Sequence, residues 1–149
     1  MFRRRASGQS IFEVVVALAI ITLILVSLVA LAGISIRNST FSRNRTSSTR
    51  INQETLEWLR GERDNDWIAF SAKAATGTWC LPSLNWAEAQ IGACGSDAGS
   101  YVNTVFRREL IFSSISATNI QVLVRVYWTD SQGEHETRAT TNFTNWKNQ

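Results

Sequence analysis

The chain has 149 residues, of which 15 are basic and 12 acidic, so its formal net charge is +3. This excess comes from three arginines at positions 3–5, and the rest of the chain is balanced at 12 of each sign, so the high pI does not indicate nucleic-acid binding. The sequence has one histidine and two cysteines, and it lacks a Gly-rich phosphate loop, zinc-ligand spacing and a nucleophile elbow. We therefore expect neither enzymatic activity nor a cofactor.

An uncharged segment dominates the N-terminal part of the chain. It runs from Val14 to Ile36 and is rich in Val, Leu, Ile and Ala. As a helix it would be roughly 34 Å long, slightly more than a hydrocarbon core of about 30 Å. Only Thr22, Ser27 and Ser35 interrupt it, and hydroxyls can bond back to their own helix. The pattern favours a membrane span over a buried helix of a soluble protein.

A secretory signal peptide is the second alternative, because it also combines a basic region with an apolar stretch. The apolar run is too long for that assignment, and Ala30-Leu31-Ala32 is only an approximate cleavage site at its far end. The small residues Ala6, Ser7 and Gly8 instead lie before the run, beside the arginines.

The segment GQSIFEVVVALAIITLILVSLVALA, which begins at Gly8, resembles the class III signal of type IV prepilins and of type II secretion pseudopilins. The resemblance implies that a membrane aspartyl peptidase (prepilin peptidase) removes residues 1–8 by cutting after Gly8. Gln9 would then be the new N-terminus, whose amine the family methylates, although the family most often has Phe there. Glu13 would be the fifth mature residue, which in the family pairs with the N-terminal amine of a neighbouring subunit.

Glu13 also stands out without the resemblance, because a carboxylate at membrane depth is costly and usually has a function and a partner. The alternative is that Glu13 only marks the interfacial end of the span. For orientation, the three leader arginines favour a cytoplasmic N-terminus, whereas Arg37, Arg43 and Arg45 beyond the span weaken that inference. The family resemblance favours the N-terminus inside and the C-terminal domain outside.

The helix is expected to continue beyond the span. Residues 38–49 are polar but contain neither Pro nor Gly, and Ile51, Thr55, Trp58 and Leu59 follow at helical spacing. Gly61 is a plausible cap position. We predict one helix from about Ile11 to Arg60. The chain would then comprise a leader (1–8), a transmembrane or filament-core helix (9–37), its amphipathic continuation (38–61) and a head (62–149).

The region from Glu62 to Ser100 is predicted to be irregular. It contains Pro82 and both cysteines, and two cysteines in a translocated domain indicate one disulfide, here Cys80–Cys94. A closed loop of about 15 residues stabilises by roughly 3 kcal/mol in the chain-entropy model. Metal binding by two cysteines so far apart is disfavoured. Glu62, Asp64 and Asp66 could bind calcium, but they lack the spacing of a calcium loop and favour a solvated turn.

Three strands are predicted in the last fifty residues. They cover Val102–Phe112, Ile120–Trp128 and Glu134–Phe143, and the second alternates most cleanly, with Val122, Val124 and Val126 on one face. Residues 130–133 form a hairpin turn. A three-stranded antiparallel sheet packed against the long helix follows, which is an α+β, pilin-like fold. His135 is expected on a strand surface, since Glu134 and Glu136 point to the opposite face.

Together these patterns predict a minor pilin-like subunit of a type IV filament. The alternatives are a type II secretion pseudopilin and a single-span anchored extracellular binding domain that does not polymerise. The implied partners are prepilin peptidase, other pilin subunits, the pilus or type II secretion assembly platform and, before assembly, the lipid bilayer. The expected location is the inner (cytoplasmic) membrane and then the pilus or pseudopilus. Nucleic acid is not an expected partner, because Arg107 and Arg108 lie on opposite faces of one strand.

Overall fold

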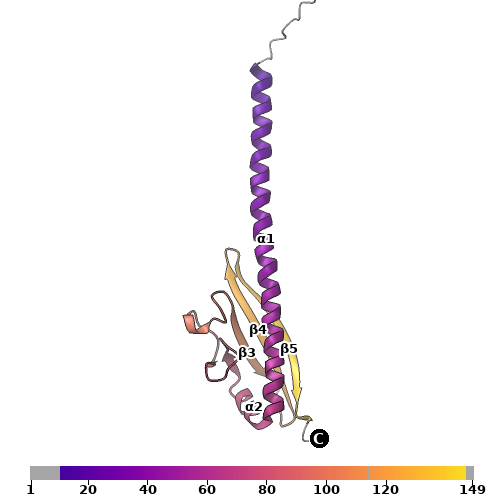
Figure 1. Ribbon diagram of the computed structural model, residues 1–149, viewed down its shortest axis with the longest axis vertical. Helices are drawn as coiled ribbons and strands as arrows, with labels where there is room; N and C mark the ends of the chain where they lie inside the picture. The colour runs from indigo at the N-terminus through magenta and orange to yellow at the C-terminus, as the bar shows by residue number, and fades with distance from the viewer. Residues whose placement is uncertain (1–10, 114, 147–149) are drawn as a thin grey trace, which may run out of the picture. The chain divides into compact units, whose positions relative to one another are not determined.

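A computed structural model describes residues 11–113 and 115–146. The chain divides into two compact units, residues 1–42 and 43–149. The elements are α1 (Ile11–Asn65), α2 (Trp67–Ala74), β1 (Thr78–Cys80), β2 (Gln90–Ile91), the 3-10 turn η1 (Ala98–Ser100), β3 (Arg107–Ser113), β4 (Asn119–Asp130) and β5 (Gly133–Thr144) (Figure 1). Among the described residues, the first unit consists of the N-terminal part of α1, and the second contains its C-terminal part and the other elements.

The long helix is confirmed, but its predicted end is wrong. α1 continues through Gly61 and ends at Asn65, five residues beyond Arg60. A glycine inside a helix costs only about 1 kcal/mol relative to alanine, which burial of Leu59 two residues earlier can offset. Asp66 sets the end instead. Its backbone is extended (φ −150°), and its side chain accepts a hydrogen bond from the Ala69 N–H as the N-cap of α2.

Helix α2 lies in the region that the sequence predicted to be irregular. Phe70 and Ala74 are the buried residues of this eight-residue helix. The Phe70 ring packs edge-on against Phe112 and Phe143 of the sheet. The following turn contains Gly77 at φ 91°, a conformation that glycine adopts without strain.

Within the described residues, five strands form one antiparallel sheet in the order β2-β1-β3-β4-β5. The three predicted strands are present, and Asp130 pairs with Gly133 (φ 119°) across the predicted hairpin turn. The first of them begins at Arg107 rather than Val102, because the Asn103 side chain accepts hydrogen bonds from the N–H groups of Val105 and Phe106 and holds a turn. The two additional strands, β1 and β2, are short.

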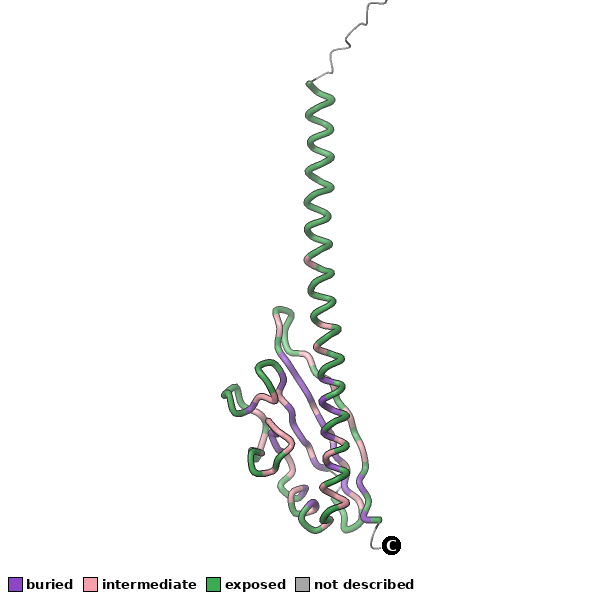
Figure 2. Tube along the Cα trace, viewed as in Figure 1, coloured by how far each residue is buried: buried purple, intermediate pink, exposed green. Residues whose placement is uncertain are grey.

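The core of the second unit lies between the sheet and the C-terminal part of α1 (Figures 1 and 2). The predicted alternation in β4 is confirmed, since Val122, Val124 and Val126 are fully buried. Polar contacts join the layers as well. Asn52 Nδ2 donates to Thr137 Oγ1 at 2.8 Å, and Thr137 Oγ1 donates to Ser48 Oγ at 3.0 Å. The α+β class predicted from the sequence is therefore correct.

Candidate functional site

The N-terminal part of α1 is exposed along nearly its whole length (Figure 2), and most of its side chains are apolar. Its large aliphatic side chains from Ile11 to Ile36 are at least 40% exposed, and Ile11 reaches 84%. By length and composition, α1 is the helix of the described chain that could cross a membrane. A surface of this kind is unfavourable in water, so lipid or other apolar helices must cover it.

Two of the three hydroxyl side chains inside this segment, those of Thr22 and Ser27, bond to their own helix. Thr22 Oγ1 donates to the Ala19 carbonyl and Ser27 Oγ donates to the Leu23 carbonyl, both at 2.8 Å. These bonds remove the need for a polar partner outside the helix, as the sequence analysis anticipated. The helix also runs without interruption through Gly33.

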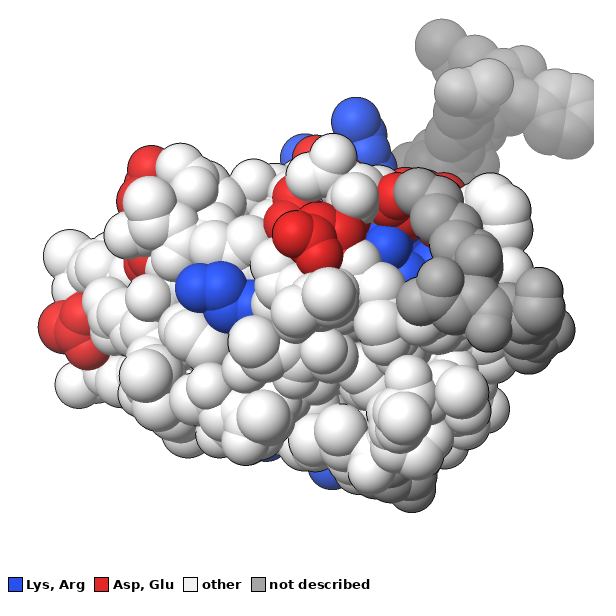
Figure 3. Space-filling view, turned by 90° about the horizontal axis from the view of Figure 1, so that it is seen from below, with Lys and Arg blue, Asp and Glu red and all other residues white. Residues whose placement is uncertain are grey.

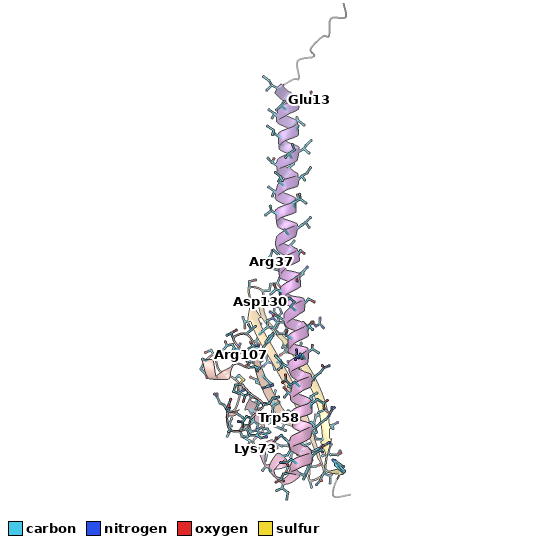
Figure 4. The ribbon with its side chains drawn as sticks, viewed as in Figure 1. Glu13, Arg37, Trp58, Lys73, Arg107 and Asp130 are labelled. Carbon is cyan, nitrogen blue, oxygen red and sulfur yellow. A yellow bond between two sulfur atoms is a disulfide. The ribbon has the colours of Figure 1, made fainter. Side chains whose placement is uncertain are left out.

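Glu13 is the carboxylate in the first turn of α1, and it is exposed. The helix N-terminus favours a negative charge at this position. Figure 4 shows Glu13 and Arg37 at opposite ends of the apolar segment. The 24 positions that separate them correspond to about 36 Å along a helix, and no charged residue lies between them. A cationic partner for Glu13 therefore cannot come from residues 14–36 of the same helix.

Gly8 and Gln9, the predicted processing residues, lie outside the described residues. Of the three residues named from the resemblance to prepilins, Gly8, Gln9 and Glu13, the structure therefore describes Glu13.

The predicted disulfide is confirmed. Cys80 and Cys94 are bonded, with a Cα–Cα distance of 4.8 Å, and Cys80 is fully buried at the end of β1. The bond closes a loop that contains β2, the edge strand of the sheet, which pairs with β1. It therefore restrains a stretch of chain that has little regular structure of its own.

Glu109 holds this loop against the sheet, a role that was not predicted from the sequence. Its side chain is 4% exposed. It accepts hydrogen bonds from the Cys94 N–H and the Tyr127 hydroxyl, both at 2.9 Å, and Arg125 Nη1 lies at 3.4 Å. Burial, followed by the hydrogen bond to Glu109, raises the pKa of Tyr127 to about 12.

Arg125 links three carboxylates on the same face of the sheet. Besides Glu109, it forms ion pairs with Glu134, at 3.0 Å, and Glu136. Burial acts to lower the pKa of Arg125, but the hydrogen bond to Glu136 and the three carboxylate charges outweigh it and raise the pKa. The pKa of Glu136 is lowered. Partial burial acts to raise it, but the hydrogen bonds and charges of Arg125 and Arg138 outweigh this effect. We call these four side chains, Arg125, Glu109, Glu134 and Glu136, the Arg125 cluster.

Arg108 lies on the opposite face of β3 from Glu109 and is 2% exposed. Nε donates to the Leu81 carbonyl at 2.9 Å, and Nη1 donates to Thr55 Oγ1 of α1 at 3.0 Å. Burial lowers the pKa of Arg108 to about 10, and the charge of Glu54 partly offsets this effect. Arg108 therefore remains charged at neutral pH and joins α1, β3 and the start of the disulfide loop.

The carboxylates considered for calcium have other roles. Glu62 accepts a hydrogen bond from Trp86 Nε1, Asp64 pairs with Arg63, and Asp66 caps α2. Among the residues that the structure describes, no group of three or more His, Cys, Asp or Glu side chains is placed to hold a metal ion.

His135 is a partly exposed strand residue, as predicted. Its Nε2 lies 3.0 Å from Asp130 Oδ1. Glu134 and Glu136 both reach Arg125 on the other face of the sheet.

Comparison with known proteins adds no family assignment. No protein-family model, curated protein or solved structure matches the chain. The fold and the site define a chain with a long helix, α1, whose apolar N-terminal part carries one carboxylate. The C-terminal part of α1 belongs to a small disulfide-bonded α+β domain.

Proposed function

We propose that the chain is a minor pilin-like subunit of a type IV filament. In this proposal, prepilin peptidase removes residues 1–8 in the cytoplasmic membrane, and the mature chain assembles through the apolar part of α1. The domain formed by residues 43–149 lies outside the membrane.

One observation carries the proposal: the exposed apolar segment of α1 has a lone carboxylate in its first turn. A helix that only anchors a domain in a membrane does not require a charge at that position. Removal of a carboxylate from water costs several kcal/mol unless a partner is present. The free amine of Gln9 created by cleavage would be such a partner, positive near neutral pH. It could belong to a neighbouring subunit, as in the family, or to the same chain, since Gln9 and Glu13 are four positions apart.

One face of the second unit gives no indication of a nucleic-acid partner. On the face shown in Figure 3, Lys and Arg side chains are separated by uncharged and acidic residues and do not form a continuous basic patch. Binding to a phosphate backbone needs several clustered cations. Filament neighbours and the bilayer are therefore the partners that the chain supports best. A type II secretion pseudopilin has the same requirements and is the closest alternative.

Filament incorporation of Glu13 variants tests the proposal. Full-length chain is expressed in a host with a type IV filament system, and its amount is measured in sheared filaments and in membranes. We expect Glu13→Leu and Glu13→Gln to insert into the membrane normally but to be depleted from filaments by about tenfold or more, because a lost charge pair of a few kcal/mol corresponds to at least that ratio.

Val14→Leu is the matched control, since it changes the adjacent side chain without altering charge, and it should enter filaments like the unmodified chain. Equal incorporation of Glu13→Leu and Val14→Leu would contradict a role for Glu13 in assembly. A chain that stays wholly in the membrane in every form would support the alternative of a single-span anchored domain.

A further inference from the structure

A cleft opens in the second unit where α1 ends, α2 begins and β5 ends (Figure 1). Its volume is about 220 Å³, less than the roughly 300–1,000 Å³ of pockets for drug-sized ligands, so it suits a ligand with a single ring. Aromatic and polar residues both line it, among them Arg63, Asp66, Trp67, Ile68, Asn145 and Trp146. We call it the Trp146 cleft.

Two tryptophan rings of the Trp146 cleft are held in place through their N–H groups. Trp146 Nε1 donates to Asp64 Oδ1 at 3.0 Å, and Trp67 Nε1 donates to the Ala117 carbonyl at 3.2 Å. Trp146 is nevertheless 56% exposed, and Ile68, which lines the same cleft, is 79% exposed. Since the N–H of Trp146 is bonded, the exposed part of this side chain is mainly apolar ring surface. Apolar side chains that gather at a cleft, unlike single scattered ones, indicate a binding surface.

Asn145 adds a buried amide to the Trp146 cleft. The residue is 8% exposed, and its backbone N–H donates to the Thr118 carbonyl at 2.9 Å. Its side-chain amide, in contrast, forms no hydrogen bond with any residue that the structure describes. A buried polar group is normally hydrogen-bonded, because its removal from water is costly otherwise. The amide carries both a donor and an acceptor, so a ligand whose groups both donate and accept would satisfy it.

The charges at the Trp146 cleft balance. Arg63 and Asp66 are the charged residues among those that line it. The Arg63 guanidinium pairs with Asp64, at 2.8 Å, and lies over the Phe143 ring. Asp66 Oδ1 accepts the Ala69 N–H as the cap of α2, and its second oxygen can accept a further hydrogen bond. One charge of each sign favours neither an anion nor a cation, so an uncharged ligand fits best.

We propose that the Trp146 cleft binds a neutral saccharide through one pyranose ring. A pyranose has a face of C–H groups and a rim of hydroxyls. The C–H face packs on the exposed ring of Trp146, whose π face is negative and attracts the C–H hydrogens. Each hydroxyl both donates and accepts, so the rim can pair with the Asn145 amide and with Asp66. A purely aliphatic ligand would leave the Asn145 amide unsatisfied.

Retention of the full-length chain on beads that carry neutral saccharides tests the proposal. The chain is purified in a detergent without a sugar headgroup, because such a headgroup would compete for the cleft. The beads carry glucose, galactose, mannose or N-acetylglucosamine, and their multivalent display makes weak binding measurable. We expect at least one kind of bead to retain the chain and the matching free sugar to release it. Retention by none of the four, or only by beads that carry the acidic sugar sialic acid, would overturn the proposal.

Variants of the cleft locate the binding. Their dissociation constants for the free sugar are measured by titration calorimetry. Trp146→Ala should weaken binding by about tenfold, whereas Trp146→Phe keeps an aromatic face and should weaken it less. Asn145→Ala should weaken binding by about fivefold, the effect of one hydrogen bond. It should leave the melting temperature unchanged, because no hydrogen bond within the described residues is lost, and this combination distinguishes a ligand-binding side chain from a structural one.

Asn44→Ala is the matched control, because it makes the same change on α1 away from the cleft, and it should bind like the unmodified chain. Equal affinities of Trp146→Ala and Asn44→Ala would overturn the assignment of the site. The inference does not rest on the proposed function. A chain that binds no saccharide can still be cut after Gly8 and enter filaments, so the two proposals can fail separately.

Discussion

The buried carboxylate of Glu109 offers the strongest test of how the head is held together. Glu109→Ala removes the acceptor for the Cys94 N–H and the Tyr127 hydroxyl, both at 2.9 Å. It also removes one of the three carboxylates that surround Arg125. Because Glu109 is only 4% exposed, water cannot readily replace these contacts.

The expected cost follows from the two short hydrogen bonds. A hydrogen bond to a charged group contributes about 1.5–3 kcal/mol, and a buried donor left without an acceptor costs a similar amount. Arg125 keeps Glu134 and Glu136, so the loss of its longer contact adds little. We therefore expect Glu109→Ala to lower the free energy of unfolding by about 3–5 kcal/mol, a large part of the stability of a small domain.

This loss of unfolding free energy is measured by denaturant unfolding of the full-length chain in detergent, monitored through the fluorescence of its six tryptophans. Titration of tyrosine absorbance provides a second readout. The pKa of Tyr127, about 12 in the intact chain, should fall when the hydrogen bond to Glu109 is removed, although the contribution of burial remains. Glu57→Ala is the control, because Glu57 is exposed on α1. Equal unfolding midpoints for the two variants would refute the role assigned to Glu109.

Three further predictions concern processing, the disulfide and acid. Gly8→Leu should block cleavage, so that the chain keeps its leader and stays in the membrane; normal filament entry of this variant would count against the proposed processing. Cys94→Ser should lower the free energy of unfolding by roughly 3 kcal/mol under oxidising conditions, and the difference should vanish when both proteins are compared with a reductant. The pKa values of Glu136 and Asp130 are lowered in the folded chain, so it binds fewer protons than the unfolded chain as acid is added. The stability that these two carboxylates contribute should therefore be fully present above their ordinary pKa values of 4.5 and 3.8, and it should be lost as the pH falls through their lowered pKa values. A melting temperature that does not change over this pH range would contradict the roles given to Glu136 and Asp130.

The elements with a long, regular pattern could be predicted from the sequence. The uncharged run and the absence of Pro predicted α1 from its first residue, and strict alternation predicted the buried face of β4. The end of α1 was missed because Gly61 was interpreted as a cap, whereas Asp66 supplies the N-cap of the next helix. The signal for that cap, an Asp directly before the apolar residues that begin α2, was present in the sequence. Strands β1 and β2 are too short to leave a periodic pattern.

The polar interior could not be predicted in the same way. Arg108 and Glu109 are adjacent charges, which ordinarily indicate solvent exposure. They are buried because β3 is covered on both sides, by α1 and by the disulfide loop. Their partners are far along the chain: Thr55 is 53 positions from Arg108, and Tyr127 is 18 positions from Glu109. Only the sheet register and the packing of α1 bring these groups together. Glu13, in contrast, stands out as a candidate from the sequence alone, because it is one charge at the edge of an apolar run, and its role in assembly stays a prediction.

The central claim is that cleavage after Gly8 creates the amine that pairs with Glu13. Intact-mass analysis of the chain purified from native membranes or filaments tests it most directly. The proposal predicts a polypeptide that begins at Gln9, with or without an added methyl group. A native chain that still carries Arg3, Arg4 and Arg5 would contradict it.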